Sequence, residues 1–264
     1  MKLARTSSTK SKRRKKAPTP IVKPSVAAPV IVARNARISE RVWTIGSLSI
    51  ILVAAVLRLY DLDLVPLHHD EGVNGNFLVR LVREGSYQYD PGNYHGPTLY
   101  YFAAMIPWIV RFIFGPSAQN SFGLTTFMIR LVPALFGLGT IWLVLLLRRR
   151  IGSLGALVAA GLLAISPGAV YLSRYFIHET LFVFFTMAIV LAALRYYEDG
   201  HPVYLIQASI SAALLFATKE TAFVSAGVLL LALVSTHAYL WLTRRLRGKR
   251  HRKEQGTQFQ LFVE

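Results

Sequence analysis

Long apolar segments with almost no charged residues are the feature that most constrains how this chain can fold. Six of them, each 16 to 21 residues long, occupy most of the sequence between residues 42 and 242. A helix of about 20 apolar residues spans the hydrocarbon core of a bilayer, and within lipid a helix satisfies its own backbone hydrogen bonds. We therefore predict an all-α, polytopic membrane protein with about six transmembrane helices. The predicted spans are 42–60, 127–147, 154–172, 181–197, 203–218 and 222–242.

The distribution of charge supports a membrane protein and argues against a nucleic-acid-binding one. Charged residues make up 16% of the chain, against about 25% in a typical soluble domain. The net charge is +17, but 12 of the 30 Lys and Arg residues lie in residues 1–41 and 7 more in residues 243–264. Basic tails beside apolar helices fit anionic lipid and the rule that orients membrane proteins. We expect the lipid bilayer, and no nucleic acid, as a partner.

Three regions follow from this pattern. Residues 1–41, rich in Ser, Pro, Lys and Arg, are expected to form a disordered, basic cytoplasmic tail. Residues 42–242 form the membrane domain, with a long outer loop at 61–126, and residues 243–264 form a second basic cytoplasmic tail. No small-residue cleavage site follows the first apolar run, so we expect that run to remain as an anchor.

The positive charges also predict the orientation of the spans. With the first tail in the cytoplasm, Arg148, Arg149 and Arg150 at the end of the second span, Arg195 in the fourth and the C-terminal tail all lie inside. This requires the apolar segment 97–114 to stay on the outer side as a juxtamembrane helix, broken or kinked at Pro107. A full crossing by 97–114 is the alternative. The prediction is a multi-pass protein of the cell membrane with both termini cytoplasmic.

In this orientation, short polar clusters gather on the outer face. The most distinctive is His68-His69-Asp70-Glu71, which follows the first span. Adjacent carboxylates flanked by imidazoles can act as a general base or bind a divalent cation. A solvated acidic loop is the plainer alternative. The other clusters are Tyr89-Asp90-Pro91 with His95-Gly96-Pro97, Ser173 to Glu179, and Thr218-Lys219-Glu220-Thr221.

Ionisable residues in or beside the spans are further candidates for function. Arg58 ends the first span, Arg130 lies inside the second, and Lys219 with Glu220 lies between the last two. Charges at membrane depth are costly and are by default a functional hypothesis. Arg130 needs either a carboxylate partner or an anionic ligand. For Arg174 and Glu179, an interfacial salt bridge is the alternative.

Taken together and in order, these motifs resemble the GT-C superfamily of membrane glycosyltransferases. The resemblance covers about residues 45–240 and rests on His68 to Glu71, Tyr89 to Pro91, His95 to Pro97, Arg130 to Gly137, Arg174-Tyr175 with Glu179, and Thr218 to Glu220. The superfamily includes protein O-mannosyltransferases, the lipid A aminoarabinose transferase and oligosaccharyltransferases. The chain most resembles a group of predicted transferases known as flippase-activity-associated proteins.

This resemblance implies that a sugar passes from a polyprenyl-phosphate donor to an acceptor glycan, lipid or protein on the outer face, with inversion at the anomeric carbon. It implies Asp70 as the catalytic base and Glu71 as its neighbour in the catalytic pair. Substrate-binding candidates are Arg58, His95, Arg130, Arg174, Glu179, Lys219 and Glu220. Relatives differ in their need for a divalent metal, so a metal is left open, with His68, His69, Asp70 and Glu71 as candidate ligands.

Two alternatives for the function stay open at this point. Superfamily members generally continue for several more spans, so the resemblance implies that this chain is an N-terminal half, the catalytic half of a hexosyltransferase. A non-enzymatic membrane subunit, or an accessory to a flippase or transporter, is the rival class. A transporter would place ionisable residues along a path near the midplane. Here most of them gather at one face, which favours a reaction site.

Overall fold

The computed structural model describes residues 38–92, 95–115 and 124–261, with side chains up to residue 245. Nearly all of the predicted tail 1–41 lies outside the described residues. Those residues belong to one compact unit, Asn35–Glu264, and they form nine helices and no strand. The predicted all-α fold class is confirmed.

Four helices are long and apolar enough to cross a membrane: α1 (Glu40–Leu59), α4 (Thr126–Leu146), α7 (Glu179–Asp199) and the portion Ala222–Arg245 of α9 (Ala222–Leu261). The bent pair α5 (Arg148–Ile165) and α6 (Pro167–Ser173) passes the same test as a fifth span. The structure therefore shows four or five of the about six predicted spans, because α8 (Val203–Phe216), in the predicted span 203–218, is apolar but only 14 residues long. Most exposed residues in the 222–242 part of α9 are apolar, among them Phe223, Val228, Leu233 and Trp241, as expected of a helix in lipid.

The predicted span 154–172 is two helices rather than one. Pro167 has no backbone N–H and disfavours helical geometry in the residue before it, and Ser166 is accordingly extended, with ψ at 119°. The axes of α5 and α6 therefore differ by 62°. At the other end of α5, Gly152 has φ at +79° and separates the first turn of the helix from the span.

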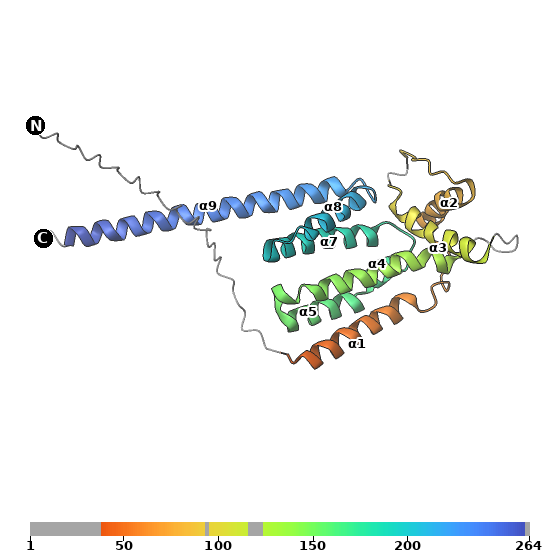
Figure 1. The fold of residues 1–264 in the computed structure, drawn as a ribbon, viewed down its shortest axis with the longest axis horizontal. Coiled ribbons are helices and arrows are strands. Elements are labelled where there is room, and N and C mark those ends of the chain that lie inside the picture. Colours follow the sequence, from red (N-terminus) through yellow and green to blue (C-terminus); the bar gives the residue numbers. More distant parts are fainter. Residues whose placement is uncertain (1–37, 93–94, 116–123, 262–264) are drawn as a thin grey trace, which may run out of the picture. The chain divides into compact units, whose positions relative to one another are not determined.

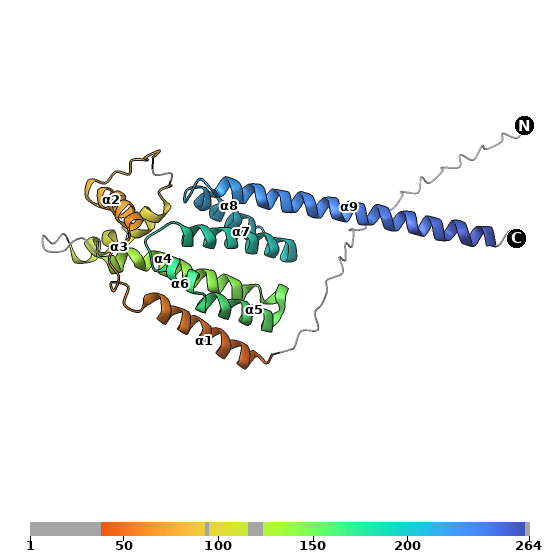
Figure 2. The same cartoon turned by 180° about the vertical axis from the view of Figure 1, so that it is seen from behind.

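The predicted outer loop contains two packed helices, α2 (His69–Glu84) and α3 (Thr98–Phe114). Figures 1 and 2 both show them gathered at one end of the bundle that α4, α5 and α7 form. Leu78 and Leu81 of α2 share one buried cluster with Leu99 and Tyr100 of α3. Of the expected break or kink at Pro107, the break is not found: α3 is one helix that contains Pro107.

The opposite end of the bundle is tied together by ion pairs. Arg148 pairs with Glu40 at the start of α1, with a second contact of 2.9 Å between NH1 and Oε2. Arg150 pairs with Glu198, and Arg149 lies 3.8 Å from Asp199, both at the end of α7. The Arg triplet, the start of α1 and the end of α7 therefore share one face, which is the grouping that the predicted orientation requires.

Candidate functional site

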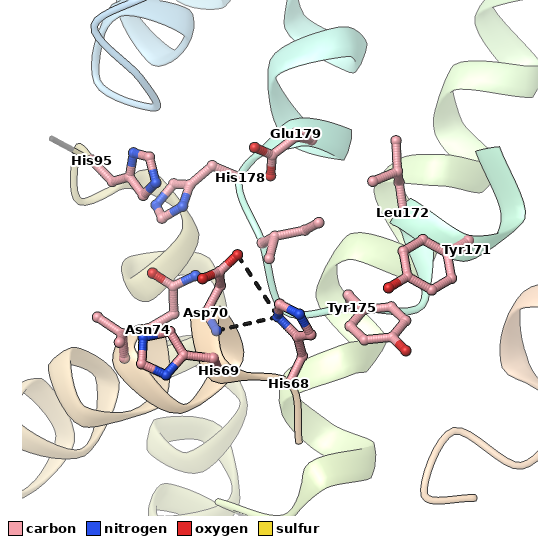
Figure 3. A pocket seen from close by; sticks show the side chains of 12 residues that line it. His68, His69, Asp70, Asn74, His95, Tyr171, Leu172, Tyr175, His178 and Glu179 are labelled. Atoms are coloured by element: carbon pink, nitrogen blue, oxygen red, sulfur yellow. Dashed lines mark hydrogen bonds and ion pairs between the residues drawn. The ribbon is translucent and has the colours of Figure 1, made fainter. Parts of the chain in front are cut away.

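A cavity of about 380 Å³ lies where α2, α6 and α7 meet, at the α2–α3 end of the bundle. Figure 3 shows its side chains: Asp70 lies between the adjacent rings of His95 and His178 and the ring of His68, and Tyr171 and Tyr175 lie on the His68 side. Three of the four polar clusters singled out in the sequence contribute to it. The lining residues are His68, His69, Asp70, Val73, Asn74, His95, Tyr171, Leu172, Tyr175, Ile177, His178 and Glu179.

The two adjacent carboxylates of the first cluster have opposite environments. The side chain of Asp70 is 65% exposed and lines the cavity, whereas that of Glu71 is 0% exposed. Successive residues at the start of a helix point about 100° apart, so the chain cannot direct both into one space. Of this predicted catalytic pair, the structure brings only Asp70 to the cavity.

Glu71 is instead the centre of a buried polar network. Its two carboxylate oxygens accept hydrogen bonds from Nε and NH2 of Arg130 at 2.8 and 2.7 Å. They also accept from the backbone N–H groups of His68 and Phe176, each at 2.9 Å. Burial acts to raise the pKa of Glu71, but these four donors outweigh it and hold the pKa below its usual value.

Arg130 completes this network from α4. Its NH1 donates to the carbonyls of Leu62 and Val65 at 2.6 and 2.8 Å, and its NH2 donates to that of Pro66 at 3.2 Å. Arg130 was expected to have either a carboxylate partner or an anionic ligand, and the structure shows a carboxylate partner, Glu71. The network fixes the chain between α1 and α2 against α4, and it thereby sets the position of Asp70.

The start of α2 carries a local capping arrangement built from the His-His-Asp-Glu sequence. His68 is the N-cap residue, and its Nδ1 accepts from the backbone N–H of Asp70 at 3.3 Å. The Glu71 carboxylate in turn accepts a hydrogen bond from the backbone N–H of His68, so both hydrogen bonds of a capping box are present. The Asp70 carboxylate lies 3.7 Å from the same imidazole.

A second wall of the cavity is made by buried polar groups from three separate segments. Asn74, one turn after Asp70, donates to the Phe176 carbonyl at 2.9 Å and accepts from the Tyr100 hydroxyl at 2.8 Å. His178 lies against Tyr100 with ring centroids 5.2 Å apart. Its Nε2 is 3.1 Å from the Gly96 carbonyl oxygen.

The last polar cluster meets the second in a short backbone pairing. The N–H of Gly96 donates to the Thr218 carbonyl at 3.1 Å, and that of Thr98 donates to the Ala217 carbonyl at 3.2 Å. This places Lys219 so that its Nζ bonds to Glu179 Oε1 at 2.8 Å, on the edge of the cavity. Glu220 instead accepts from the Tyr89 hydroxyl at 3.4 Å.

Arg58 and Arg174 each bind the C-terminal end of a neighbouring helix. Arg58, 1% exposed, donates from α1 to the carbonyls of Leu163 and Ala164 at the end of α5, at 3.2 and 2.9 Å. Arg174, which follows α6, donates to three carbonyls at the end of α1, those of Leu57, Tyr60 and Asp61. Cations suit helix C-termini, where carbonyls lack intrahelical partners.

A second cavity, of about 250 Å³, lies next to the first and within the spans. It shares Leu172 and Glu179 with the first cavity, and Arg58 lies in its wall. Most of its lining is apolar. The other lining residues are Gly137, Thr140, Leu163, Ala169, Thr180 and Val183.

The candidate metal ligands do not converge. In the parts of the chain that the structure describes, no three His, Asp or Glu side chains are grouped so that they could hold a metal ion. Glu71 is turned into its pair with Arg130, and His68 Nδ1 is engaged by the Asp70 backbone. The residues present therefore do not form a built metal site.

Several residues of this cavity were not predicted from the sequence. Asn74 is four residues after Asp70, and helical periodicity alone places both on one face. Tyr171 and Tyr175 bring their rings to 4.4 Å, and His178 directly precedes Glu179. Each of these residues is close in sequence to a predicted site residue, but only the fold shows which of the sequence neighbours face the cavity.

Fold and site define the class of protein: a multi-pass α-helical membrane protein with a polar cavity at one end of its spans. A family model described as dolichyl-phosphate-mannose-protein mannosyltransferase matches residues 102–247. This is more than half of the chain, and the chain belongs to that family of GT-C membrane glycosyltransferases, which use polyprenyl-phosphate sugar donors. No curated protein matches the chain. The solved structures gave no match either.

Proposed function

We propose that this chain transfers a sugar, as a hexosyltransferase, from a polyprenyl-phosphate donor to an acceptor hydroxyl at the outer face of the cell membrane. The acceptor is a glycan, lipid or protein. The observation that carries the proposal is the environment of Asp70, an open carboxylate on the wall of a polar cavity at the membrane boundary. The order of motifs along the chain supports a place among the flippase-activity-associated transferases.

Asp70 is the carboxylate best suited to act as general base. Two acidic side chains line the cavity, and the other, Glu179, is bound by Lys219. In the proposed step the acceptor oxygen attacks the anomeric carbon and its proton passes to Asp70. The bond between that carbon and the phosphate oxygen breaks, and polyprenyl phosphate leaves. A base must lie within hydrogen-bond reach of the proton it takes, which an exposed cavity residue can do.

The donor would lie across both cavities. Its apolar chain suits the second cavity, whose wall is mostly apolar, and its sugar suits the first. Lys219 is the cation we assign to the phosphate, because it lies at the boundary and its present partner Glu179 lines both cavities. Arg58, Arg130 and Arg174 are each engaged by the protein itself, and their contact with phosphate stays a prediction.

The test is a transfer assay with radiolabelled polyprenyl-phosphate hexoses and membranes that contain this chain. We expect Asp70→Asn to lower turnover by about 10²–10⁴-fold, the usual contribution of a general base, with the amount of membrane-inserted protein unchanged. Glu84→Gln, an exposed carboxylate of the same helix, is the matched control and should leave turnover as it is. Near-normal turnover by Asp70→Asn would overturn the assignment. Absence of turnover by a full-length version would favour the non-enzymatic accessory role.

A further inference from the structure

Two imidazoles on the cavity wall have a ring nitrogen without a hydrogen-bond partner. Nδ1 of His178 and Nδ1 of His95 are both buried, and among the described residues neither has a donor or acceptor within reach. Their ring centroids are 4.7 Å apart, and both residues line the cavity that holds Asp70 (Figure 3). Buried polar groups are almost always paired, so each exception calls for an explanation.

The chemistry of the His178 nitrogen can be assigned from its surroundings. Nε2 lies 3.1 Å from a carbonyl oxygen, which can only accept, so Nε2 carries the ring hydrogen. Burial, with a smaller contribution from His95, lowers the pKa of His178 to about 3, so the ring is neutral at physiological pH. Nδ1 therefore presents a lone pair. It is an acceptor that needs a hydroxyl or N–H donor.

The position of this acceptor favours the donor's sugar as its partner. His178 directly precedes Glu179, whose carboxylate holds Lys219, the cation assigned to the donor phosphate. A sugar joined to that phosphate would lie beside His178. The bond from Nε2 to Gly96 and the edge contact with Tyr100 fix the ring, so its acceptor direction is set before a ligand arrives.

We propose that Nδ1 of His178 accepts a hydrogen bond from one hydroxyl of the transferred sugar, and that this contact helps to determine which sugar the protein accepts. The proposal rests on the proposed function. Because both Nδ1 atoms are covered, we expect the rings of His178 and His95 to part slightly as the hydroxyl enters. His178 would be a residue of substrate recognition, while the base remains Asp70.

The experiment compares dolichyl-phosphate mannose with its 2-, 3-, 4- and 6-deoxy analogues as competitors for binding to membranes that contain the full chain. The unmodified protein should bind one analogue at least about tenfold more weakly than the parent, because that analogue leaves the acceptor unpaired. In His178→Gln the amide nitrogen can replace Nε2 toward Gly96, but no acceptor remains at Nδ1. This variant should bind the parent and that analogue within about twofold of each other.

His201→Gln, at an exposed histidine between α7 and α8, is the matched control and should keep the tenfold preference. His178→Asn, which restores an oxygen near Nδ1, should recover part of it. If His178→Gln keeps the full preference against every analogue, or if the unmodified protein shows none, the proposal is wrong. Because the readout is binding, it is independent of turnover. Loss of turnover in Asp70→Asn with no role for His178 would leave the proposed function standing.

Discussion

At the scale of single residues, Glu71 and Arg130 show how a buried charge pair positions the neighbouring Asp70. The pair connects α2, α4, the chain before α2 and the backbone at Phe176 through hydrogen bonds of 2.6 to 3.2 Å. Both side chains are nearly inaccessible, at 0 and 2% exposed. Their role in this structure is to hold the start of α2, on which Asp70 lies.

We predict that Glu71→Gln lowers the stability of the protein and not the rate of the transfer step. Removing one member of a buried ion pair leaves the other charge unpaired and costs about 3–5 kcal/mol. The melting temperature of the detergent-solubilised protein should fall clearly, while the fraction that remains folded should still bind the donor. Glu84→Gln, exposed on the same helix, should melt like the unmodified protein.

The double variant Glu71→Met with Arg130→Met tests whether such a loss comes from the unpaired charge or from a direct role of Glu71 in the reaction. Without either charge, the cost of the unpaired charge should be recovered, but not that of the Leu62, Val65 and Pro66 carbonyls, which lose their donor. A Glu71→Gln protein of normal stability whose turnover falls as far as that of Asp70→Asn would show instead that Glu71 takes part in the reaction.

The sequence predicts the residue types of the site better than their partners. Asp70, His95 and Glu179 line the cavity, as expected of site residues. The sequence also shows that Arg130 needs an anion, but the choice between a carboxylate and a ligand depends on which of two adjacent acids turns inward. That choice follows from the helical phase of α2 against α4, which residue types alone do not determine.

At the scale of elements, the segment before α3 is held to the turn between α8 and α9 by two backbone hydrogen bonds. Gly96 lies at the centre of this contact. A Cβ at Gly96 would lie 2.6 Å from the Ala217 carbonyl carbon and closer still to its oxygen. The neighbour is backbone, which cannot turn aside as a side chain can.

We therefore predict that Gly96→Ala separates these two segments, destabilises the protein by about 1–3 kcal/mol and weakens donor binding. Gly75→Ala in α2 is the control, because a Cβ there meets nothing within 4 Å and Ala favours helix. Its stability should be equal or slightly higher. Limited proteolysis and donor competition on both variants would measure the effect. Equal behaviour of the two variants would show that the contact does not matter.

Hydropathy predicts where helices form. Whether a helix is interrupted depends on what each proline does to it. Pro167 separates two helices, because it disfavours helical geometry in Ser166, whose ψ is 119°. Pro107 is also inside an apolar segment, yet α3 continues through it with its buried face packed against α2. Tertiary packing decides between these outcomes, and sequence pattern does not contain it.

At the scale of the whole molecule, we predict that the cavity faces the outside of the cell and the Arg triplet faces the cytoplasm. The chain has no cysteine, so single cysteines can report this directly. Cys at exposed Ser86, beside α2, should react with a membrane-impermeant thiol reagent in intact cells. Cys at exposed His201, between α7 and α8, should react only after the cells are opened, as should Cys at Ser8. The reverse labelling pattern would show that the protein has the opposite orientation in the membrane.

Arg58 has a consequence for the physics of the membrane around it. Its partners are neutral carbonyls, which stabilise a guanidinium without cancelling its unit charge. In a low-dielectric surrounding that charge creates a long-range electric potential: at an effective dielectric constant of about 20, a unit anion about 8 Å away gains about 2 kcal/mol. Arg58 is therefore a fixed source of positive potential in the wall of the second cavity, where the other charged side chain, Glu179, is already paired with Lys219.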